Sequence, residues 1–413
     1  MPLYYGSDAS SRSTVLLTTT LRIKKTTKTM NLLIDFIPFQ TQGGYGGAAS
    51  FAKAVYDELF ATRDTGMQVM AAYDATLPTE GRFDCHQLAS QWGIPLVDIS
   101  TKPLAEVISS HAVDTFFIAI GQFYAPYDLR DIKCKVIMFI HDIFDVERCD
   151  NRIDLMLSDK FNESSLQYAK RLFNLWSGRW QRQQRKRYEQ VIQLFSAANT
   201  IPYTVSEYSR SALEYYFPQC ANKIRICYSP LKNQEKPAPI EHPKLAQLVQ
   251  SGKPYLLMLA ANRIYKNPST VVKVFSKLQE EHPDLHLLTL KYGKSTSPRH
   301  IDIDYLSDAD LEHAYKHACA LVFGSFFEGF GYPPIEAARH GTPTVASNVT
   351  SIPEILGDAG IYFSPFYPAD LYRALKLVLA DRDTYAMKSH QRYEQICKRQ
   401  RSDLDKLIQA IIL

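Results

Sequence analysis

The 413-residue sequence has few of the features that mark a metal site, a disulfide framework or a membrane span. Its seven cysteines are scattered and odd in number, and no two are spaced as C-x-x-C. This pattern argues against a zinc site and against paired disulfides, and it is typical of a reducing cytosol. No stretch reaches the roughly 18 uninterrupted apolar residues of a membrane-spanning helix. The sequence therefore predicts a cytoplasmic chain without a span.

An excess of charge of one sign is also missing. The Lys and Arg residues exceed the Asp and Glu residues only slightly, which gives a net charge of +4 and a pI of about 8.5. So mild a balance does not demand a nucleic-acid partner, and we predict none. A dinucleotide-binding G-x-G-x-x-G fingerprint is absent as well. The glycines of the early loop GGYGG do not fit that spacing, and no clear acidic partner follows about 20 residues on.

Apolar strand-like runs alternate with amphipathic helical segments, a pattern typical of parallel α/β sheets. A chain of this length is expected to form two such domains. Residues 1–29, rich in Ser, Thr, Lys and Arg, are interpreted as a disordered extension or the result of an upstream start codon rather than a targeting signal. The other predicted parts are a first domain (30–228), a Pro- and Lys-rich linker (229–253), a second domain (254–385) and C-terminal helices (386–413).

One stretch, FGSFFEGFGYPPIEAARHGTPTVAS at residues 323–347, concentrates the features of a ligand site. The apolar run at 321–323 predicts a buried strand that ends at this loop. Pro333 or Pro334 suits the first position of the following helix, and Gly341 is a plausible stop just past its end. The loop therefore lies at the carboxyl end of a strand, where open α/β sheets bind ligands.

The loop and the helix start can hold an anion together with several hydroxyl groups. Gly329 and Gly331 let the backbone approach a ligand closely. The N–H groups and the positive dipole end of the helix start favour phosphate. Glu328 and Glu336 add carboxylate acceptors for hydroxyls, so the set describes a sugar-nucleotide site. The alternative is that Glu336 only complements the dipole of its own helix and that Glu328 is a solvated loop residue.

The segment FEGFGYPPIEAARHGTPTVASNVTSIPEILGDAGIYFSP closely resembles the donor-site signature of the retaining glycosyltransferases of family 4 (glycosyl transferases group 1), with its E-x7-E pattern. This resemblance implies the α/β GT-B fold, in which two Rossmann-like domains face each other across a cleft. It also implies that the first domain lies on the acceptor side, that the second binds the nucleotide sugar, and that the C-terminal helices cross back to the first.

The resemblance assigns roles to residues of the second domain. Arg263 and Lys266, which come just before a predicted helix, would neutralise the diphosphate of the donor, although two loop cations are more often solvated. Glu336 would accept hydrogen bonds from the ribose, and Glu328 from the sugar hydroxyls. The loop backbone and the helix start complete the predicted donor site, which comprises Gly329, Phe330, Gly331, Tyr332 and Pro333.

The same resemblance predicts no metal and no other cofactor, because in this fold the two cations usually replace a metal. The D-x-D triplets at 302–304 and 308–310 hold a metal in another glycosyltransferase fold. Here Asp310 is already explained by capping of a helix that begins after Ser307, and the pattern is very weak. We interpret both triplets as structural.

In the first domain, MFIHDIF places His141 and Asp142 directly after a buried strand. A lone histidine there is more often structural, but the strand end and the His–Asp pair of the relatives favour a place near the transferred sugar. Asp142 would orient the histidine or contact the acceptor. The glycine loop of the relatives faces the donor phosphates and the acceptor, and here it comprises Gly43, Gly44, Gly46 and Gly47. Ala48 and Ala49 stand where many relatives carry a basic or aromatic residue. Whether this loop contacts the acceptor is therefore an open question.

Residues 170–187 hold seven Lys or Arg and no acidic residue, with Trp176 and Trp180 four positions apart on one predicted helical face. A basic amphipathic helix can lie on an anionic membrane, which would make the protein peripheral on the inner face of that membrane. The alternative is a solvated helix whose tryptophans face the domain core.

The sequence thus predicts a retaining glycosyltransferase that moves a hexose from a nucleotide diphosphate sugar to a glycan or lipid-linked acceptor in cell-surface polysaccharide synthesis. Mannose or rhamnose is the first candidate for the sugar, and the donor is a GDP-, UDP- or dTDP-sugar. A sugar-nucleotide epimerase of the same fold is one alternative, against which the long family signature argues. A non-catalytic donor-binding subunit is the other, and the four intact charged residues of the donor site argue against it.

Overall fold

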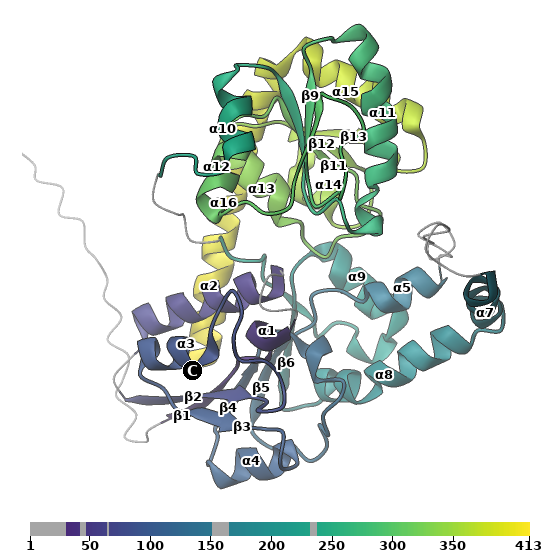
Figure 1. The fold of residues 1–413 in the computed structure, drawn as a ribbon. Helices are drawn as coiled ribbons and strands as arrows, with labels where there is room; N and C mark the ends of the chain where they lie inside the picture. Colours follow the sequence, from purple (N-terminus) through teal and green to yellow (C-terminus); the bar gives the residue numbers. More distant parts are fainter. Residues whose placement is uncertain (1–29, 42–46, 64–65, 151–164, 232–237) are drawn as a thin grey trace, which may run out of the picture.

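The computed structural model describes residues 30–41, 47–63, 66–150, 165–231 and 238–413. Figure 1 shows two α/β domains, one above the other, with the long C-terminal helix α16 running from one to the other. The predictions for residues 1–29, for Gly43, Gly44 and Gly46, and for the middle of the expected linker lie outside the described residues.

The first domain is built on a seven-stranded sheet with the order β3-β2-β1-β4-β5-β6-β7, in which every pair is parallel. The central strands are apolar on both faces because helices cover both sides of the sheet. The strands are β1 (Met30–Asp35), β2 (Met67–Tyr73), β3 (Leu96–Asp98), β4 (Thr115–Ile118), β5 (Lys135–Phe139), β6 (Thr200–Thr204) and β7 (Arg225–Ile226).

The second domain repeats this plan with a six-stranded parallel sheet of order β10-β9-β8-β11-β12-β13. In each sheet the strand order reverses beside the first strand, which creates a crevice at the carboxyl ends of the strands. The prediction of two Rossmann-like domains is confirmed. The strands are β8 (Tyr255–Met258), β9 (His286–Leu290), β10 (His300–Ile303), β11 (Ala320–Phe323), β12 (Thr344–Ser347) and β13 (Gly360–Phe363).

Serine side chains cap two of the described helices, and the cap at Ser307 is one that the sequence predicted. Ser206 Oγ accepts a hydrogen bond from the backbone N–H of Ser209, and Ser307 Oγ accepts one from Asp310. The helices of the first domain are α1 (Ile37–Gln40), α2 (Gly47–Thr62), α3 (Cys85–Trp92), α4 (Leu104–Ser110), α5 (Phe144–Asp150), α7 (Ser165–Trp176), α8 (Arg179–Ser196) and α9 (Glu207–Tyr216). Those that follow are α10 (Pro243–Gln250), α11 (Pro268–Glu281), α12 (Asp308–His317), α13 (Tyr332–Arg339), α14 (Ile352–Leu356), α15 (Pro368–Ala380) and α16 (Arg382–Ile412). None of these described helices combines the length and the apolar character that crossing a bilayer requires.

The structure differs from the sequence-based expectation at three places. Helix α10 lies within the segment interpreted as a linker, and its Leu245 and Leu248 are buried in the core of the second domain. Strand β10 is not predicted by the sequence pattern, because it is a run of four residues with only two apolar side chains. The placement of Trp176 and Trp180 on one helical face is wrong. Gly178 adopts a left-handed conformation with φ of 64° and separates α7 from α8.

Helix α16 ties the two domains together along its length. Near its start, Ser389 Oγ donates a hydrogen bond of 3.0 Å to the carbonyl of Thr342 in the second domain. Further along, Arg401 forms an ion pair with Glu58 of α2, with an N–O distance of 2.8 Å. The last turns bury leucine and isoleucine side chains in the core of the first domain, among them Leu404, Leu407, Ile408 and Ile411.

Asp35, the last residue of β1, has a fully buried side chain. The Asp35 side chain accepts hydrogen bonds of 2.9 Å from both the Tyr124 hydroxyl and the Ile37 backbone N–H. The Tyr56 hydroxyl donates to the Asp35 carbonyl at 2.6 Å. Complete burial raises the pKa of Asp35 to about 7, even though these hydrogen bonds favour the charged form.

This raised pKa predicts a pH-dependent effect of Asp35→Asn. The pKa of the folded state lies above that of the unfolded state, so the contribution of Asp35 to stability is present at low pH and lost as pH rises through about 7. Between pH 5 and pH 8 the wild type should lose roughly 2 to 3 kcal/mol from this group. Chemical denaturation should therefore show that Asp35→Asn is more stable, relative to the wild type, at pH 8 than at pH 5. The exposed Asp131→Asn is the control, and an equal pH dependence in wild type and Asp35→Asn would contradict the prediction.

Candidate active site

The loops at the carboxyl ends of the two sheets come together where the domains meet. The loop after β11 carries Glu328 and leads into α13, and the turn after β8 carries Lys266. On the side of the first domain, Gly47 begins α2. A Cβ atom added to Gly47 would lie 3.6 Å from the ring of Tyr332, the first residue of α13. The starts of α2 and α13 are therefore in contact across the domain boundary.

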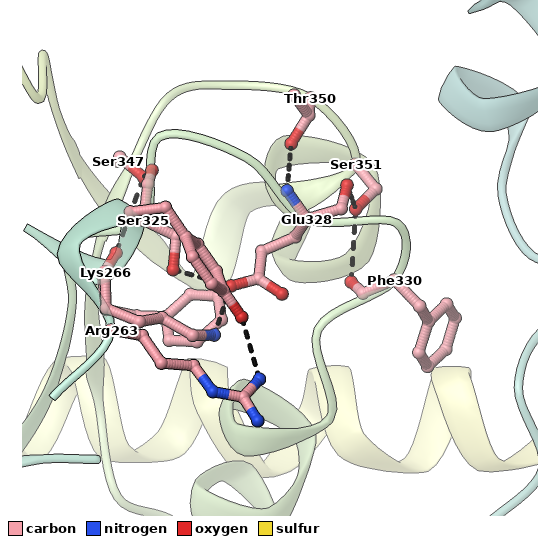
Figure 2. A network of polar contacts seen from close by, with 10 residues as sticks. Arg263, Lys266, Ser325, Glu328, Phe330, Ser347, Thr350 and Ser351 are labelled. Carbon is pink, nitrogen blue, oxygen red and sulfur yellow. Dashed lines mark hydrogen bonds and ion pairs between the residues drawn. The ribbon is translucent and has the colours of Figure 1, made fainter. Parts of the chain in front are cut away.

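At the centre of this region Lys266 and Glu328 form an ion pair through Nζ and Oε1 (Figure 2). Both side chains are nearly buried, with 11% and 13% exposed. The Ser325 hydroxyl donates a hydrogen bond of 2.6 Å to the same carboxylate oxygen. The ammonium group of Lys266 also lies 4.7 Å from the ring centre of Phe323, at the end of β11. The two residues that the sequence predicted for separate parts of the donor are thus in direct contact.

The backbone around Glu328 is held by residues that follow β12. The Glu328 N–H donates to Thr350 Oγ1 at 3.1 Å. Ser351 Oγ lies 2.9 Å and 3.2 Å from the carbonyl oxygens of Glu328 and Phe330, and it can donate to either (Figure 2). Gly331 has a φ of 95°, which allows the sharp turn into α13. These contacts hold the backbone from which the Glu328 side chain extends.

The first domain also contacts this loop, from the other side. The Gly329 carbonyl accepts a hydrogen bond of 2.8 Å from Ser206 Oγ, at the start of α9. A Cβ atom added to Gly329 would lie only 3.0 Å from the carbonyl oxygen of His141 and 3.2 Å from Cβ of Asp142. Phe330 points away from the Glu328 carboxylate and is buried in the core of the first domain, 5.5 Å from the ring of Tyr228 (Figure 2).

Glu354, on α14 of the second domain, makes a further contact between the domains. Its Oε1 atom accepts hydrogen bonds from the Glu207 N–H at 2.9 Å and from the Tyr228 hydroxyl at 2.7 Å. Its Oε2 atom accepts from the Tyr208 N–H at 3.1 Å. The carboxylate thus lies at the positive end of α9, where a negative charge is stabilised. Sequence reasoning missed this residue, because a glutamate in the first turn of its own helix is unremarkable.

His141 lies beside this loop and is held as a neutral imidazole. Its Nε2 lies 3.1 Å from the carbonyl oxygen of Ala119, so Nε2 carries the proton and donates it. The ring packs edge-on against Phe51, with the ring centres 4.5 Å apart. Burial lowers the pKa of His141 to about 4. Its Nδ1 atom is therefore a hydrogen-bond acceptor at neutral pH.

Two carboxyl groups follow His141 in the chain, the half-buried Asp142 and the buried Glu147. Burial raises the pKa of Asp142 to about 6, and the negative charges of Asp145 and Glu328 act in the same direction. Glu147, which sequence reasoning did not identify, accepts a hydrogen bond of 2.5 Å from the Tyr208 hydroxyl. Burial is also the main reason that the pKa of Glu147 is raised to about 7. The first domain thus places carboxyl groups that are easily protonated next to the loop.

Arg263 lies at the surface rather than among the buried groups. Its Nη1 atom donates a hydrogen bond of 3.0 Å to the hydroxyl of Tyr265. Figure 2 shows the guanidinium group on the same side of the loop as the Lys266 ammonium. The structure therefore brings the two predicted cations together, one buried and the other open to solvent.

Glu336 lines a cavity of about 420 Å³ between the two domains. Its Oε2 atom accepts a hydrogen bond of 2.6 Å from the hydroxyl of Tyr315, which is fully buried. Lys53 of α2 lines the same cavity, and so do Arg82 and Asp308, which form an ion pair of 2.5 Å from opposite domains. A carboxylate in this position can accept hydrogen bonds from a ligand in the cavity in addition to interacting with the dipole of its own helix.

The D-x-D triplets have hydrogen-bond partners that explain them. Asp302 accepts hydrogen bonds from Thr289 Oγ1 at 2.6 Å and from the N–H groups of Tyr292 and Gly293. Asp310 accepts one of 2.8 Å from the Glu241 N–H. Within the part of the chain that the structure describes, no group of three or more His, Cys, Asp or Glu side chains could hold a metal ion.

Comparison with known protein families finds a match over the second domain. Residues 243–398 match the family model described as "Glycosyl transferases group 1". The predicted resemblance to this family is confirmed. The match begins at α10, and it includes Lys266, Glu328 and Glu336 but not His141.

Several curated proteins with similar sequences are mannosyltransferases, and others are D-inositol 3-phosphate glycosyltransferases. The serotype-specific mannosyltransferase WbdA of Escherichia coli is 33% identical over 154 residues, which make up 33% of this chain and 19% of WbdA. The O-antigen chain mannosyltransferase B of Escherichia coli is 49% identical over 63 residues, 15% of this chain and 16% of that protein. The chain thus spans about a fifth or less of the length of these relatives.

Solved structures with the same fold cover almost the whole chain. Sucrose-phosphate synthase from Thermosynechococcus elongatus has a TM-score of 0.63 at 15% identity, over 92% of this chain and 98% of that one. HepE from Anabaena, in complex with UDP-glucose, has a TM-score of 0.62 at 14% identity, with the same coverage. At such low identity the likeness shows the fold alone, and it confirms the predicted GT-B fold.

The close approach of Gly329 to the first domain predicts a large effect of Gly329→Ala. The added methyl group would meet a backbone oxygen at 3.0 Å, so the loop and the end of β5 must move apart. Forced overpacking of this kind costs about 1 to 3 kcal/mol. Chemical denaturation should show this loss. Gly66→Ala is the control, because an added Cβ atom there meets no other atom within 4 Å. A variant at 329 as stable as this control would contradict the close contact.

Proposed function

We propose that this protein is a retaining glycosyltransferase that moves a hexose from a nucleotide diphosphate sugar to a glycan or lipid-linked acceptor in cell-surface polysaccharide synthesis. The observation that carries the proposal is the Lys266–Glu328 pair, fixed at the carboxyl ends of two facing parallel sheets by a loop that both domains hold. The match to the group 1 glycosyl transferases and the similarity to mannosyltransferases support it.

The donor would lie along the second domain. An ammonium group has three N–H donors, so Lys266 can hold Glu328 and a phosphate oxygen together. Arg263, on the same side of the loop, would add a guanidinium group to the diphosphate site. The start of α13, at Tyr332 and Pro333, contributes backbone N–H groups and the positive end of its dipole. No metal is needed in this arrangement, because the two side-chain cations neutralise the diphosphate.

The two glutamates would bind different hydroxyl groups of the donor. Glu328 lies beside Lys266, next to the first domain, and would accept hydrogen bonds from the transferred sugar. Glu336 lines the cavity between the domains and would accept them from the ribose. His141 is neutral and uses its Nε2 proton on Ala119, so it would accept a sugar hydroxyl at Nδ1 rather than act as an acid. Asp142 would contact the acceptor.

The transfer itself would need no nucleophile from the protein. The bond between the anomeric carbon and the phosphate oxygen breaks, and its electron pair leaves with the nucleoside diphosphate. The acceptor oxygen forms the new bond on the same face of the sugar and loses its proton to the departing phosphate. Negative charge therefore grows on the diphosphate in the transition state, where Lys266 and Arg263 stabilise it.

The relatives favour mannose as the sugar, and GDP-mannose is therefore the first candidate for the donor. The two alternatives predict different chemistry at the same site. A sugar-nucleotide epimerase would convert a UDP-sugar without any acceptor. A donor-binding subunit would bind the nucleotide sugar and change nothing.

A screen of nucleotide sugars by thermal unfolding tests the proposal directly. A donor at about 100 times its Kd should stabilise the protein by about 2.7 kcal/mol, and we expect GDP-mannose to give the largest shift. Incubation of the stabilising donor with oligosaccharide acceptors should then yield a glycoside with the anomeric configuration of the donor, measured by NMR. Stabilisation without transfer, or conversion of the donor without an acceptor, would overturn the proposal in favour of one alternative.

The proposed division between the two glutamates predicts different kinetic effects. Glu336→Gln should mainly raise KM, because ribose contacts are the same in the ground state and the transition state. Glu328→Gln should mainly lower kcat, because its contact to the sugar tightens as positive charge develops. Steady-state kinetics of both variants with one donor will measure this. Equal and small effects on both constants would contradict the assigned roles.

A further inference from the structure

An exposed apolar face on α7 has no role in the proposed site. Figure 1 shows α7 at the outer end of α8, at the edge of the first domain. The side chains of Leu166, Phe173 and Trp176 are 81%, 48% and 85% exposed. Their spacings of seven and three residues place them on one face of the helix. The rings of Phe173 and Trp176 lie 6.3 Å apart, so they form one continuous aromatic surface.

Cationic side chains adjoin this apolar face. Arg179, Arg182 and Lys186 are exposed and recur at helical spacing on α8, opposite the face that buries Tyr188. The Arg179 guanidinium lies 5.3 Å from the ring centre of Phe173 and joins the two helices. The sequence from 165 to 188 contains no acidic residue. With the exposed Lys170 of α7, these residues make up what we call the α7–α8 patch: Leu166, Lys170, Phe173, Trp176, Arg179, Arg182 and Lys186.

Trp180 does not belong to this patch. It is only partly exposed, and the guanidinium group of Arg148 lies 5.3 Å from its ring centre. Gly178 turns the chain between the two helices, so that Trp176 faces solvent while Trp180 packs beside α5. The exposed apolar surface is thus formed within α7.

We propose that the α7–α8 patch docks the protein on an anionic lipid surface. Helix α7 would lie in the plane of the interface, with Leu166 and Phe173 among the acyl chains and Trp176 at the depth of the headgroups. The cations of α8 would contact lipid phosphates at the same level. This docking concerns a surface away from the Lys266–Glu328 loop, and it does not depend on the proposed glycosyl transfer.

The charge of the patch decides between lipid and a second copy of the chain. A symmetric dimer would bring the same patch of both copies together, and Arg179, Arg182 and Lys186 would face like charges. An anionic bilayer supplies phosphates for these cations and hydrocarbon for Leu166. A nucleic acid supplies phosphates and stacking surfaces but has no hydrocarbon layer for an aliphatic side chain.

Co-sedimentation with vesicles tests the proposal on the full chain. Wild type should bind vesicles that contain phosphatidylglycerol at low salt, and bind phosphatidylcholine vesicles much less. At about 1 M salt, where the Debye length falls to about 3 Å, binding to the anionic vesicles should drop steeply. The fluorescence of Trp176 should shift to shorter wavelength on binding, and this shift should be absent in Trp176→Ser.

Charge reversal separates the patch from the overall charge of the protein. Each cation near an anionic leaflet strengthens binding about fivefold, so reversing Arg179, Arg182 and Lys186 to Glu should weaken it at least about 100-fold. The matched control reverses three exposed lysines of the second domain and should bind as wild type: Lys253, Lys273 and Lys294. Circular dichroism and the unfolding midpoint confirm that both variants are folded.

Three outcomes would overturn the proposal. The wild type could stay in the supernatant with anionic vesicles even at low salt. The control triple variant could lose binding as strongly as the patch variant, which would show only a general charge effect. Sedimentation without lipid could reveal a dimer that Trp176→Ser dissociates, which would make a second copy the occupant of the patch.

Discussion

The fixation of one loop by both domains is the constraint on which the rest of the site depends. The segment from Glu328 to Gly331 leaves the sheet of the second domain, but Gly329 packs on the backbone of His141 and Phe330 is buried in the core of the first domain. The loop therefore cannot move without separating the domains. Its carboxylate, the Lys266 ammonium and the start of α13 are held at one place because of this double attachment.

The two domains place different charged and polar groups around this loop. The second domain supplies the buried Lys266 and the exposed Arg263, a positive region suited to a diphosphate. The first domain supplies the neutral His141 and two carboxyl groups whose pKa values are raised. Glu354 of the second domain contacts the first domain and accepts hydrogen bonds from the backbone N–H groups at the N-terminus of α9. In the proposed function, an anionic donor would lie along the second domain, and the groups of the first domain would exchange hydrogen bonds with hydroxyls.

Much of the fold could be predicted because its signals are local. The apolar strands and the cap at Ser307 follow from patterns within a few residues, and α11 begins just after Lys266, as the sequence predicts. The predictions failed where the packing of distant segments decides. Helix α10 looks like a linker until the core of the second domain covers Leu245 and Leu248. The exposure of Trp176 depends on the turn at Gly178. The spacing of residues along a helix does not predict the direction of this turn.

By itself, the sequence determined two parallel α/β domains, and a loop with one carboxylate and two glycines before a helix that carries a second carboxylate, because strand periodicity and glycine spacing are properties of neighbouring residues. It also indicated the residue types of the candidate site. Only the tertiary structure decided that Lys266 pairs with Glu328, that Glu336 faces a cavity, and that Glu354 caps a helix of the other domain. The physical reason is that each of these contacts joins segments far apart in the chain. Lys266 and Glu328 meet because β8 and β11 are neighbours in one sheet, and the other two arise only where the carboxyl ends of the two sheets come together.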